Sequence, residues 1–383
     1  MNGIYIHFPY CVHKCSYCDF YSIENLNSRN KFVQNLCFEI AKYREQNGSK
    51  IKADTLFIGG GTPSLMKPHH IEKIFETLHQ NIDFADDSEM TMECNPGTID
   101  VKYMSVYKDM GINRISFGVQ SFIERDLKFL ERIHSPGDVG LAIDIARNAG
   151  FENLSIDLMF ALPNQSLDDW RYNLERAVEL ETNHISAYSL IYEPGTPLYE
   201  EYISGKIQPQ SDDKDAEFYE ITNEVLSKAG FEQYEVSNYA KPNFKCKHNL
   251  KYWSGSEYFG FGPSAHSYIH KKRYWNYRSN HKYFELLEKN EFPVEGYEDL
   301  SEKQILFEKI YLGLRAEGLN IDELKHSYNI DLYDENENFI NNLKSEGLLN
   351  FNNGVIKLTN KGYFVGDNIT VEFAKTLDKF FGE

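Results

Sequence analysis

The chain has 383 residues, a net charge of −18 and an isoelectric point near 5.2. An acidic chain without a long Lys/Arg block disfavours nucleic acid as a substrate, because binding phosphates needs a basic surface. No apolar run approaches the about 18 residues that a membrane-spanning helix needs. Only six cysteines occur, and a strand begins at once where a signal peptide would stand. Both features predict a cytoplasmic protein.

Short β-branched or aromatic runs alternate with amphipathic helical stretches over the first half of the chain. The predicted strands are 4–8, 55–59, 89–94, 114–119, 153–160 and 184–191, and the predicted helices are 28–46, 68–80, 100–109, 136–148 and 166–180. Six βα units in series predict a parallel sheet with right-handed crossovers. We therefore expect an α/β fold whose sheet curls into a partial (β/α)6 TIM-like barrel, with an open doubly wound sheet as the alternative.

The loop after the first predicted strand carries three closely spaced cysteines, Cys11, Cys15 and Cys18, in the pattern C-x3-C-x2-C. Three thiolates can hold three irons of a [4Fe–4S] cluster and leave the fourth iron open to a small molecule. The pattern, with Tyr17 before the third cysteine, resembles that of the radical S-adenosylmethionine (SAM) superfamily. The resemblance implies that the open iron binds SAM and cleaves it reductively.

Other roles for the cysteines are less well supported. A zinc ion held with His13 or His7 is one alternative, although structural zinc usually draws its ligands as two separated pairs. A disulfide does not suit a reducing cytosol. Cys37 and Cys94 are expected to pack in the core, and the role of Cys246 stays open.

Glycine-rich or polar residues also occur at or near the ends of the other predicted strands, in the segments 59–64, 93–97, 118–121, 155–157 and 192–196. The βα loops of a barrel meet at the carboxyl ends of its strands, so we expect one shared site. Glu93 and Asp157 lie within apolar strands, where a carboxylate is costly unless something polar binds it; each caps a neighbouring loop in the alternative. Gln120 and Arg132 suit a carboxylate-bearing ligand, and Arg132 makes a surface ion pair in the alternative.

Motifs that follow one another along nearly the whole chain narrow the resemblance. They are Tyr-Ile-His-Phe-Pro-Tyr-Cys, Gly-Gly-Gly-Thr-Pro-Ser, Glu-Cys-Asn-Pro-Gly, Ser-Phe-Gly-Val-Gln-Ser-Phe, Leu-Glu-Arg-Ile-His and Ile-Asp-Leu-Met-Phe-Ala-Leu-Pro. Together they resemble the oxygen-independent coproporphyrinogen III dehydrogenase family and its relatives. The resemblance implies SAM contacts from Tyr5, Gly60, Gly61, Thr62 and Glu93, and positions for a second SAM at Gln120, Arg132 and Asp157.

Three features separate the chain from a true dehydrogenase. The dehydrogenase motif has a further cysteine where this chain has Phe20, and the dehydrogenase carries an N-terminal extension before its first strand. The third feature is His-Asn-Leu-Lys-Tyr-Trp at 248–253, which resembles the HNxxYW motif of a haem-chaperone branch. That resemblance implies that His248, Tyr252 and Trp253 bind haem.

The chemistry of this motif agrees with haem binding without requiring it. An imidazole is a good axial ligand for haem iron, and Tyr252 and Trp253 offer flat faces to a porphyrin. A histidine beside aromatic residues is more often packed in a core. Cys246 and His266 therefore stay open beside His248 as axial ligands.

The last part of the chain is predicted to form an α+β unit that resembles a winged helix. Its expected elements are helices 302–316, 321–327 and 332–345, a hairpin within 347–359 with Asn-Gly at its turn, and a helix that starts at 359. The unit is not basic enough for DNA, and a lid or docking surface fits it better. The predicted domains are a radical SAM partial barrel at 1–210, a bridging region with the HNxxYW motif at 211–297, and a C-terminal domain at 298–383.

These features favour a haem chaperone, a radical SAM-type [4Fe–4S] protein that binds haem and passes it to apo-haemoproteins. The alternative is a coproporphyrinogen III dehydrogenase, which forms protoporphyrinogen IX by oxidative decarboxylation in haem biosynthesis. Whether the protein is an enzyme stays open, and no catalytic residue is assigned. The expected partners are haem or a related tetrapyrrole and an apo-haemoprotein, and a homodimer is a further expectation.

Overall fold

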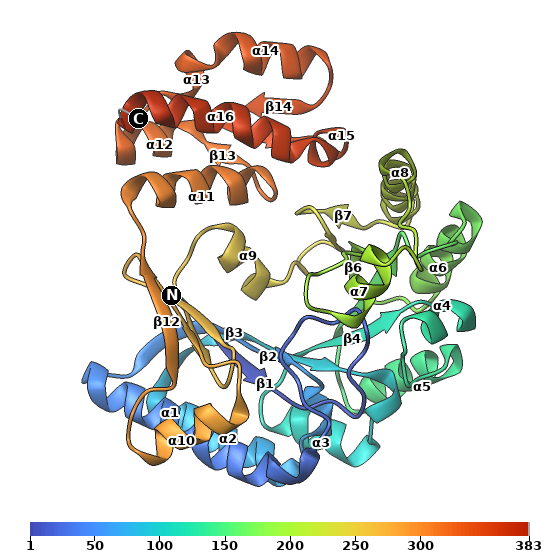
Figure 1. The fold of residues 1–383 in the computed structure, drawn as a ribbon, viewed down its shortest axis with the longest axis vertical. Coiled ribbons are helices and arrows are strands. Elements are labelled where there is room, and N and C mark those ends of the chain that lie inside the picture. The colour runs from blue at the N-terminus through green and yellow to red at the C-terminus, as the bar shows by residue number, and fades with distance from the viewer. Residues whose placement is uncertain (382–383) are drawn as a thin grey trace.

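Six parallel strands with helical crossovers form the centre of the computed structural model, which describes residues 1–381 (Figure 1). The strands are β1 Asn2–Phe8, β2 Ile51–Gly60, β3 Ile82–Cys94, β4 Arg114–Gln120, β5 Asn153–Phe160 and β6 His184–Ser189. The crossovers carry η1 Leu26–Ser28, α1 Arg29–Asn47, η2 Pro63–Leu65, α2 Pro68–Asn81, η3 Pro96–Thr98, α3 Val101–Asp109, α4 Glu124–Phe129, α5 Pro136–Asn148 and α6 Leu167–Glu179. The predicted α/β fold with a partial barrel is confirmed, although β2 and β3 begin earlier than expected.

Alternation along the strands separates an apolar layer from a polar interior. In β4, Ile115, Phe117 and Val119 are buried in the core between the sheet and its helices. Arg114 and Ser116 point the other way and line a cavity inside the barrel. The barrel therefore has a polar centre, in which chemistry can be placed.

Short strands extend the sheet on both sides of the six central strands. Beyond β1 lie β9 Tyr258–Phe261, β10 His266–Ile269, β11 Lys272–Asn276 and β12 Val294–Asp299, and beyond β6 lie β8 Asn238–Ala240 and β7 Glu232–Gln233. Strand β9 is parallel to β1, and the other added strands pair in antiparallel fashion. The remaining helices of this part are α7 Pro197–Ile203, α8 Asp212–Lys228, α9 Lys247–Trp253 and α10 Asn280–Glu288. Strands β7 and β8 pair with each other and are separated by a short bend at residues 235–237.

The C-terminal elements form a separate body with its own apolar core, at the top of Figure 1. They are α11 Glu302–Leu314, β13 Leu319–Asn320, α12 Ile321–Tyr328, α13 Leu332–Glu335, α14 Glu337–Ser345, β14 Leu349–Asn352, β15 Val355–Leu358, α15 Asn360–Phe364 and α16 Gly366–Phe381. The predicted hairpin turns at Asn353 and Gly354, which both have positive φ angles. The predicted helix 332–345 is interrupted at Asn336. The domain boundaries stay a prediction, and residues 382–383 of the last domain lie outside the described residues.

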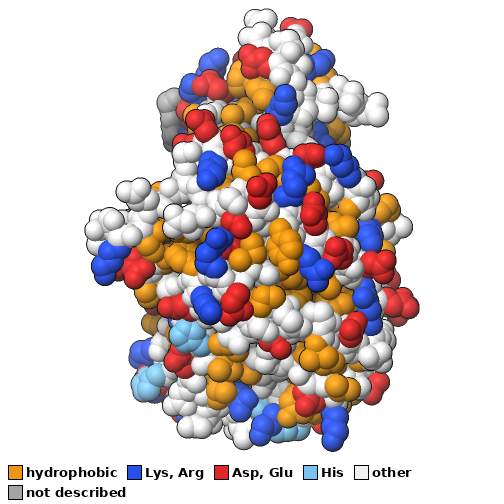
Figure 2. All heavy atoms as spheres, turned by 90° about the vertical axis from the view of Figure 1, so that its right-hand side faces the viewer, with side chains coloured by type: hydrophobic (Ala, Val, Ile, Leu, Met, Phe, Trp, Pro, Cys, Tyr) orange, Lys and Arg blue, Asp and Glu red, His pale blue; other side chains and the backbone are white. Residues whose placement is uncertain are grey.

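The surface over α4, α5, α6 and α8 carries charges of both signs among hydrophobic side chains (Figure 2), and several of these charges form ion pairs. The absence of a nucleic-acid partner stays a prediction from the composition. Within residues 1–381, no helix is both long enough and apolar enough to cross a membrane.

Candidate functional site

The cysteine loop leaves the carboxyl end of β1 and is tied down by backbone hydrogen bonds. The Cys11 and Ile23 amides donate to the Ile23 and Pro9 carbonyls, at 3.0 and 2.9 Å. The Gly61 and Thr62 amides of the next loop donate to carbonyls of residues 8 and 10, both at 2.7 Å. The path of the loop is therefore set by its neighbour after β2.

Cys11, Cys15 and Cys18 all line one cavity of about 720 Å³, and none forms a disulfide. Two donors approach their sulfurs: Thr62 Oγ1 lies 3.5 Å from Cys11 Sγ, and Arg132 Nη1 lies 3.8 Å from Cys15 Sγ. Burial raises the pKa of Cys15, and it raises the pKa of Cys18 to about 11. Thiols must lose their protons to bind metal, so loading this loop releases protons.

The histidines of the zinc alternative already have partners. His13 lies 3.2 Å from Glu24 and 3.3 Å from Glu131, measured between ring nitrogens and carboxylate oxygens. Buried His7 accepts from the Tyr5 hydroxyl at 3.0 Å and donates to the Tyr21 carbonyl at 2.8 Å. Across residues 1–381, no three His, Cys, Asp or Glu side chains are grouped to hold a single metal ion.

Gly60 and Gly61 line the same cavity, but the protein itself requires their lack of a side chain. Gly60 has a φ of +105°, and a Cβ there would lie 2.7 Å from the His7 ring. A Cβ on Gly61 would lie 2.5 Å from the Tyr10 carbonyl oxygen. The glycines therefore let the cysteine loop and the β2 loop come together, as well as leaving room for a ligand.

Glu93 and Asp157 face each other across the barrel interior and line the cysteine cavity. Glu93 Oε2 accepts from the Gly60 amide at 3.1 Å, and Asp157 accepts from Ser116 Oγ at 3.2 Å. Burial, and then repulsion from Asp157, raise the pKa of Glu93 from 4.5 to about 8. Burial also raises the pKa of Asp157. A bound cationic or hydrogen-bonding group would stabilise the ionised forms of both.

Gln120 and Arg132 reach the cysteine cavity from the two ends of one loop. Gln120 ends β4 with a φ of +67°, and Arg132 Nη2 donates to the Gly118 carbonyl at 2.7 Å. Arg132 Nε is buried without a hydrogen-bond partner among the described residues. Arg132 therefore keeps a donor free beside the cavity.

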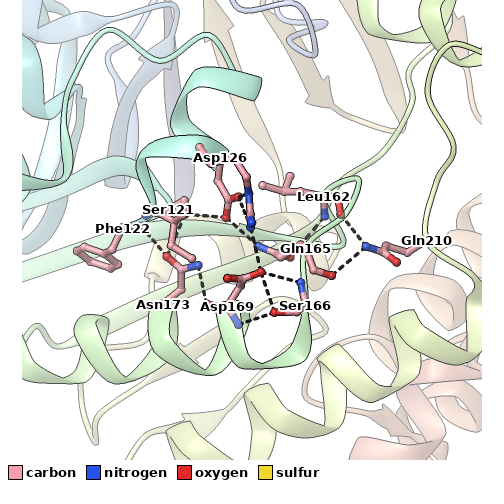
Figure 3. A network of polar contacts seen from close by, with 11 residues as sticks. Ser121, Phe122, Asp126, Leu162, Gln165, Ser166, Asp169, Asn173 and Gln210 are labelled. Atoms are coloured by element: carbon pink, nitrogen blue, oxygen red, sulfur yellow. Dashed lines mark hydrogen bonds and ion pairs between the residues drawn. The ribbon is translucent and has the colours of Figure 1, made fainter.

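A buried polar network fixes the loop that carries these two residues (Figure 3). Asn173 Oδ1 accepts from Ser121 Oγ at 3.0 Å and from the Phe122 amide, so α6 holds the end of β4. Asp126 Oδ2 lies 3.1 Å from Ser121 Oγ, whose single proton is shared between Asp126 and Asn173, and it accepts from Gln165 Nε2 at 3.3 Å. The network orders the backbone between Gln120 and Arg132 without touching the cavity itself.

A second, inner cavity of about 510 Å³ adjoins the first. Both cavities are lined by Gly60, Glu93, Asp157, Asp19, Phe20 and Tyr188. Tyr5 lines only the inner cavity, away from the cysteines, whereas the other predicted SAM residues line the cysteine cavity. The predicted SAM residues thus lie together, with Tyr5 deeper in the barrel than the rest.

The HNxxYW motif forms α9, which lies against the amino ends of the first strands, opposite the cysteine loop. A Cβ on Gly3 of β1 would lie 3.2 Å from His248 Cε1, and Lys251 Nζ donates to the Met1 carbonyl at 2.8 Å. Glu89 of β3 accepts from the amides of residues 247 and 248, both at 3.1 Å, at the start of the helix. Helix α9 therefore covers this end of the barrel.

His248 is only 1% exposed and uses both ring nitrogens within the protein. Nδ1 is bonded to Thr55 Oγ1 at 2.8 Å, and Nε2 to the Tyr252 hydroxyl at 3.0 Å. Burial lowers the pKa of His248 to about 3, so its ring is neutral. Asn249 and Tyr252 line the inner cavity, whereas Trp253 lines neither cavity.

The two alternative axial ligands differ in access. Cys246 is fully buried, and its thiol donates to Glu89 at 3.4 Å. His266 is exposed, stacks on Trp275 with ring centroids 5.8 Å apart, and lines the inner cavity.

Sequence reasoning gave no role to Arg114 and Asn249, which line the inner cavity, and named His7, which also lines it, only as a possible zinc ligand. His7 and Arg114 are polar residues within or beside an apolar run, which was the signal that singled out Glu93 and Asp157.

The fold and the cysteine loop define a radical SAM protein. A model described as the radical SAM superfamily matches residues 5–177, and one described as the HemN C-terminal domain matches residues 300–365. The solved structure of coproporphyrinogen III oxidase (HemN) from Escherichia coli matches with a TM-score of 0.82, over 99% of this chain and 90% of that one. Its identity is 20%, so the likeness shows the fold alone.

Two curated relatives are similar over much longer parts of the sequence than the family model. The heme chaperone HemW of Bacillus subtilis is 34% identical over 376 residues, which cover 96% of this chain and 98% of the relative. The heme chaperone HemW of Escherichia coli is 39% identical over 272 residues, or 70% of each chain. The chain therefore belongs to the HemW family of radical SAM proteins.

The family implies a [4Fe–4S] cluster and SAM, and the residues present fit both. Three free thiols share one cavity with donors near two of their sulfurs, as a negatively charged cluster requires. Cys11, Cys15 and Cys18 would hold the cluster, which could supply an electron to bound SAM. The protein positions the three thiols on one cavity, and burial raises the pKa of the nearby Glu93 and Asp157 carboxyl groups.

Proposed function

We propose that this protein binds haem inside its barrel and passes it to apo-haemoproteins. Its HemW relatives carry the name heme chaperone. The observation that carries the proposal is the position of α9, which directs Asn249 and Tyr252 into a cavity that adjoins the cysteine cavity. Haem bound there would lie between the HNxxYW helix and the cluster loop.

Phe20 favours a carrier over a dehydrogenase. Its side chain is 66% exposed and lines both cavities, where the dehydrogenase pattern has a thiol. An exposed apolar ring offers a porphyrin a contact surface and cannot take part in redox or acid–base chemistry. The 20% identical HemN structure supports only the shared fold.

We propose His248 as the axial ligand of the haem iron. Its Nε2 is hydrogen-bonded to the hydroxyl of Tyr252, which itself lines the inner cavity. Haem would have to displace the Tyr252 hydroxyl to reach this nitrogen, while Thr55 keeps the ring oriented through Nδ1. His266, which is already exposed to the cavity, is the comparison that the test must include.

Cys11, Cys15 and Cys18 would hold the cluster. SAM would bind at Gly60, Gly61, Thr62 and Glu93 with Tyr5 behind them, and a second SAM position would use Gln120, Arg132 and Asp157. The location of these residues on adjoining cavities supports the proposal. A homodimer and docking of the recipient on the C-terminal body stay predictions.

The test uses the full-length protein after anaerobic reconstitution of its cluster. One sample is titrated with haem, watched by absorbance, and then mixed with an apo-haemoprotein; a second receives coproporphyrinogen III, SAM and a reductant. We expect saturable haem binding, transfer of haem, and no protoporphyrinogen IX. Robust protoporphyrinogen formation without haem transfer would establish the dehydrogenase instead.

The ligand is tested with His248→Ala, His266→Ala and Cys246→Ser in parallel, each checked for folding by circular dichroism. His248→Ala should weaken haem binding and change the haem spectrum, and the other two should not. A haem spectrum that changes only in His266→Ala would identify His266 as the axial ligand instead.

A further inference from the structure

Arg114, the first residue of β4, is a buried cation to which the proposed cluster and SAM sites assign no role. Its side chain is only 2% exposed and lines the inner cavity. Among residues 1–381 its guanidinium makes no hydrogen bond and no ion pair, and its Nε is fully buried without a partner. Buried polar groups in folded proteins are almost always hydrogen-bonded, so an exception of this kind needs an explanation.

The acidic groups near Arg114 are bonded elsewhere. Glu89 accepts from the Cys246 thiol and from two amides at the start of α9. Asp157 accepts from Ser116 Oγ. Arg114 is charged, because a guanidinium keeps its proton even when buried. Burial opposes the charge, whereas nearby acidic groups that include Glu89 raise the pKa of Arg114.

The third nearby carboxyl group supplies little countercharge. Burial raises the pKa of Glu93 to about 8, so near neutral pH this group is mostly protonated. Burial also raises the pKa of Asp157. Among the described residues, two arginines line the inner cavity, and Arg278 is paired with Asp19 whereas Arg114 has no ion pair. Because burial opposes ionisation of Glu93 and Asp157, an anion added beside Arg114 meets less repulsion than the residue types suggest.

Arg114 lies beside the HNxxYW helix. Its charge acts on both Cys246 and His248. Asn249 and Tyr252 line the cavity that Arg114 also lines. A ligand group near Arg114 could thus receive hydrogen bonds from an amide and a hydroxyl as well as from the guanidinium.

We propose that Arg114 binds a carboxylate of the ligand in the inner cavity. A guanidinium presents its donors in a planar fork that matches the two oxygens of a carboxylate, and it stays charged when buried. If the protein is a haem carrier, as proposed above, this carboxylate is a propionate of haem, which enters the barrel with that edge first. The carboxylate of SAM has the same chemistry and is the competing source.

The test compares haem with its iron dimethyl ester, in which both propionates are blocked, on the reconstituted wild type and on Arg114→Gln. Wild type should bind haem about 10- to 100-fold more tightly than the ester, as expected for a charge-assisted hydrogen bond. Arg114→Gln should bind both with similar, weaker affinity. SAM affinity and iron content should not change.

Arg176→Gln is the matched control, because Arg176 is a surface arginine paired with Glu179 on α6; it should behave as wild type. Thermal unfolding of the apo-protein gives a second readout. A purely structural Arg114 would make Arg114→Gln less stable, whereas a ligand-binding Arg114 should leave stability equal or raise it, since an unpaired buried charge is removed.

Equal affinities of wild type for haem and its ester would overturn the propionate assignment while leaving haem binding intact. Loss of SAM affinity in Arg114→Gln, with haem binding unchanged, would assign the carboxylate to SAM. If the wild-type protein binds neither haem nor the ester, both the carrier function and the propionate assignment are contradicted.

Discussion

The two ends of the barrel use the same strands but are built in different ways. At the carboxyl ends, backbone hydrogen bonds and glycines bring the cysteine loop and the β2 loop together, and few side chains are needed to hold them. At the amino ends, α9 is held by buried side chains, chiefly Thr55, Glu89 and His248. Substitutions at the carboxyl ends should therefore act through steric clashes with the backbone or loss of a metal ligand. Substitutions at the amino ends should act by leaving buried polar groups without partners.

The largest effect is expected at the cysteine loop. Cys15→Ser should abolish the cluster, because two thiolates cannot hold the cubane. Iron and acid-labile sulfide are counted after anaerobic reconstitution. Cys37→Ser, at a buried cysteine packed between α1 and α2, should keep full iron and sulfide. Full iron content in Cys15→Ser would show that the loop does not bind the cluster.

His248→Ala should be the next most damaging change, and its effect should be confined to the amino end. It leaves a cavity beside Phe57 and removes the partners of Thr55 and Tyr252, which together should lower the free energy of unfolding by about 2–4 kcal/mol. Denaturant unfolding measures this loss, and iron analysis should show an intact cluster. A variant as stable as wild type would mean that α9 is not held through this ring.

Gly61→Val should lower stability by about 2–3 kcal/mol, because its Cβ would meet the Tyr10 carbonyl at 2.5 Å. The strain falls on the cysteine loop, so cluster content and SAM affinity should drop together. Gly140→Ala in α5 is the control: its added Cβ meets nothing within 4 Å, and it should stabilise by about 0.5–1 kcal/mol. Loss of SAM affinity with normal cluster content would place the clash on SAM instead.

The smallest effect within any one pH unit is a pH dependence of the stability of the apo-protein through Glu93. The folded carboxyl has a pKa of about 8, against 4.5 for the free group. The folded state binds more protons between these values, so this contribution is fully present below pH 4.5 and is lost as the pH rises through 8, with a slope of at most about 1.4 kcal/mol per pH unit. Unfolding measured across this range should show a shallower slope in Glu93→Gln than in wild type. The exposed Glu152→Gln should keep the wild-type slope, and an unchanged slope in Glu93→Gln would refute the assignment.

Local patterns predicted the central barrel well, because each βα unit is specified by its own strand run and helix. Ser166 caps the start of α6, and Gly48, in a left-handed conformation, ends α1; both lie close to the boundaries that the sequence indicates. The added strands β9 to β12 were not predicted. They are short, and β9 has its place because it pairs with β1, more than 250 residues away in the chain.

The site residues were predicted from loops that follow strands, and that rule finds only one end of a barrel. It located Gly60, Glu93 and Arg132 on the cysteine cavity. It could not show that the HNxxYW motif lies at the opposite end, or that His248 is enclosed by Thr55 and Tyr252. Those contacts join residues far apart in sequence and depend on tertiary structure.

We expect one barrel to hold two separate iron sites, the cluster and the haem. Anomalous X-ray diffraction at the iron edge from crystals of the reconstituted, haem-loaded protein tests this expectation most directly. The expected map has a cluster peak at Cys11, Cys15 and Cys18 and a separate single-iron peak beside His248 Nε2, at the inner cavity. A single-iron peak on the outer surface, or haem iron bound by the three cysteines in place of the cluster, would contradict it.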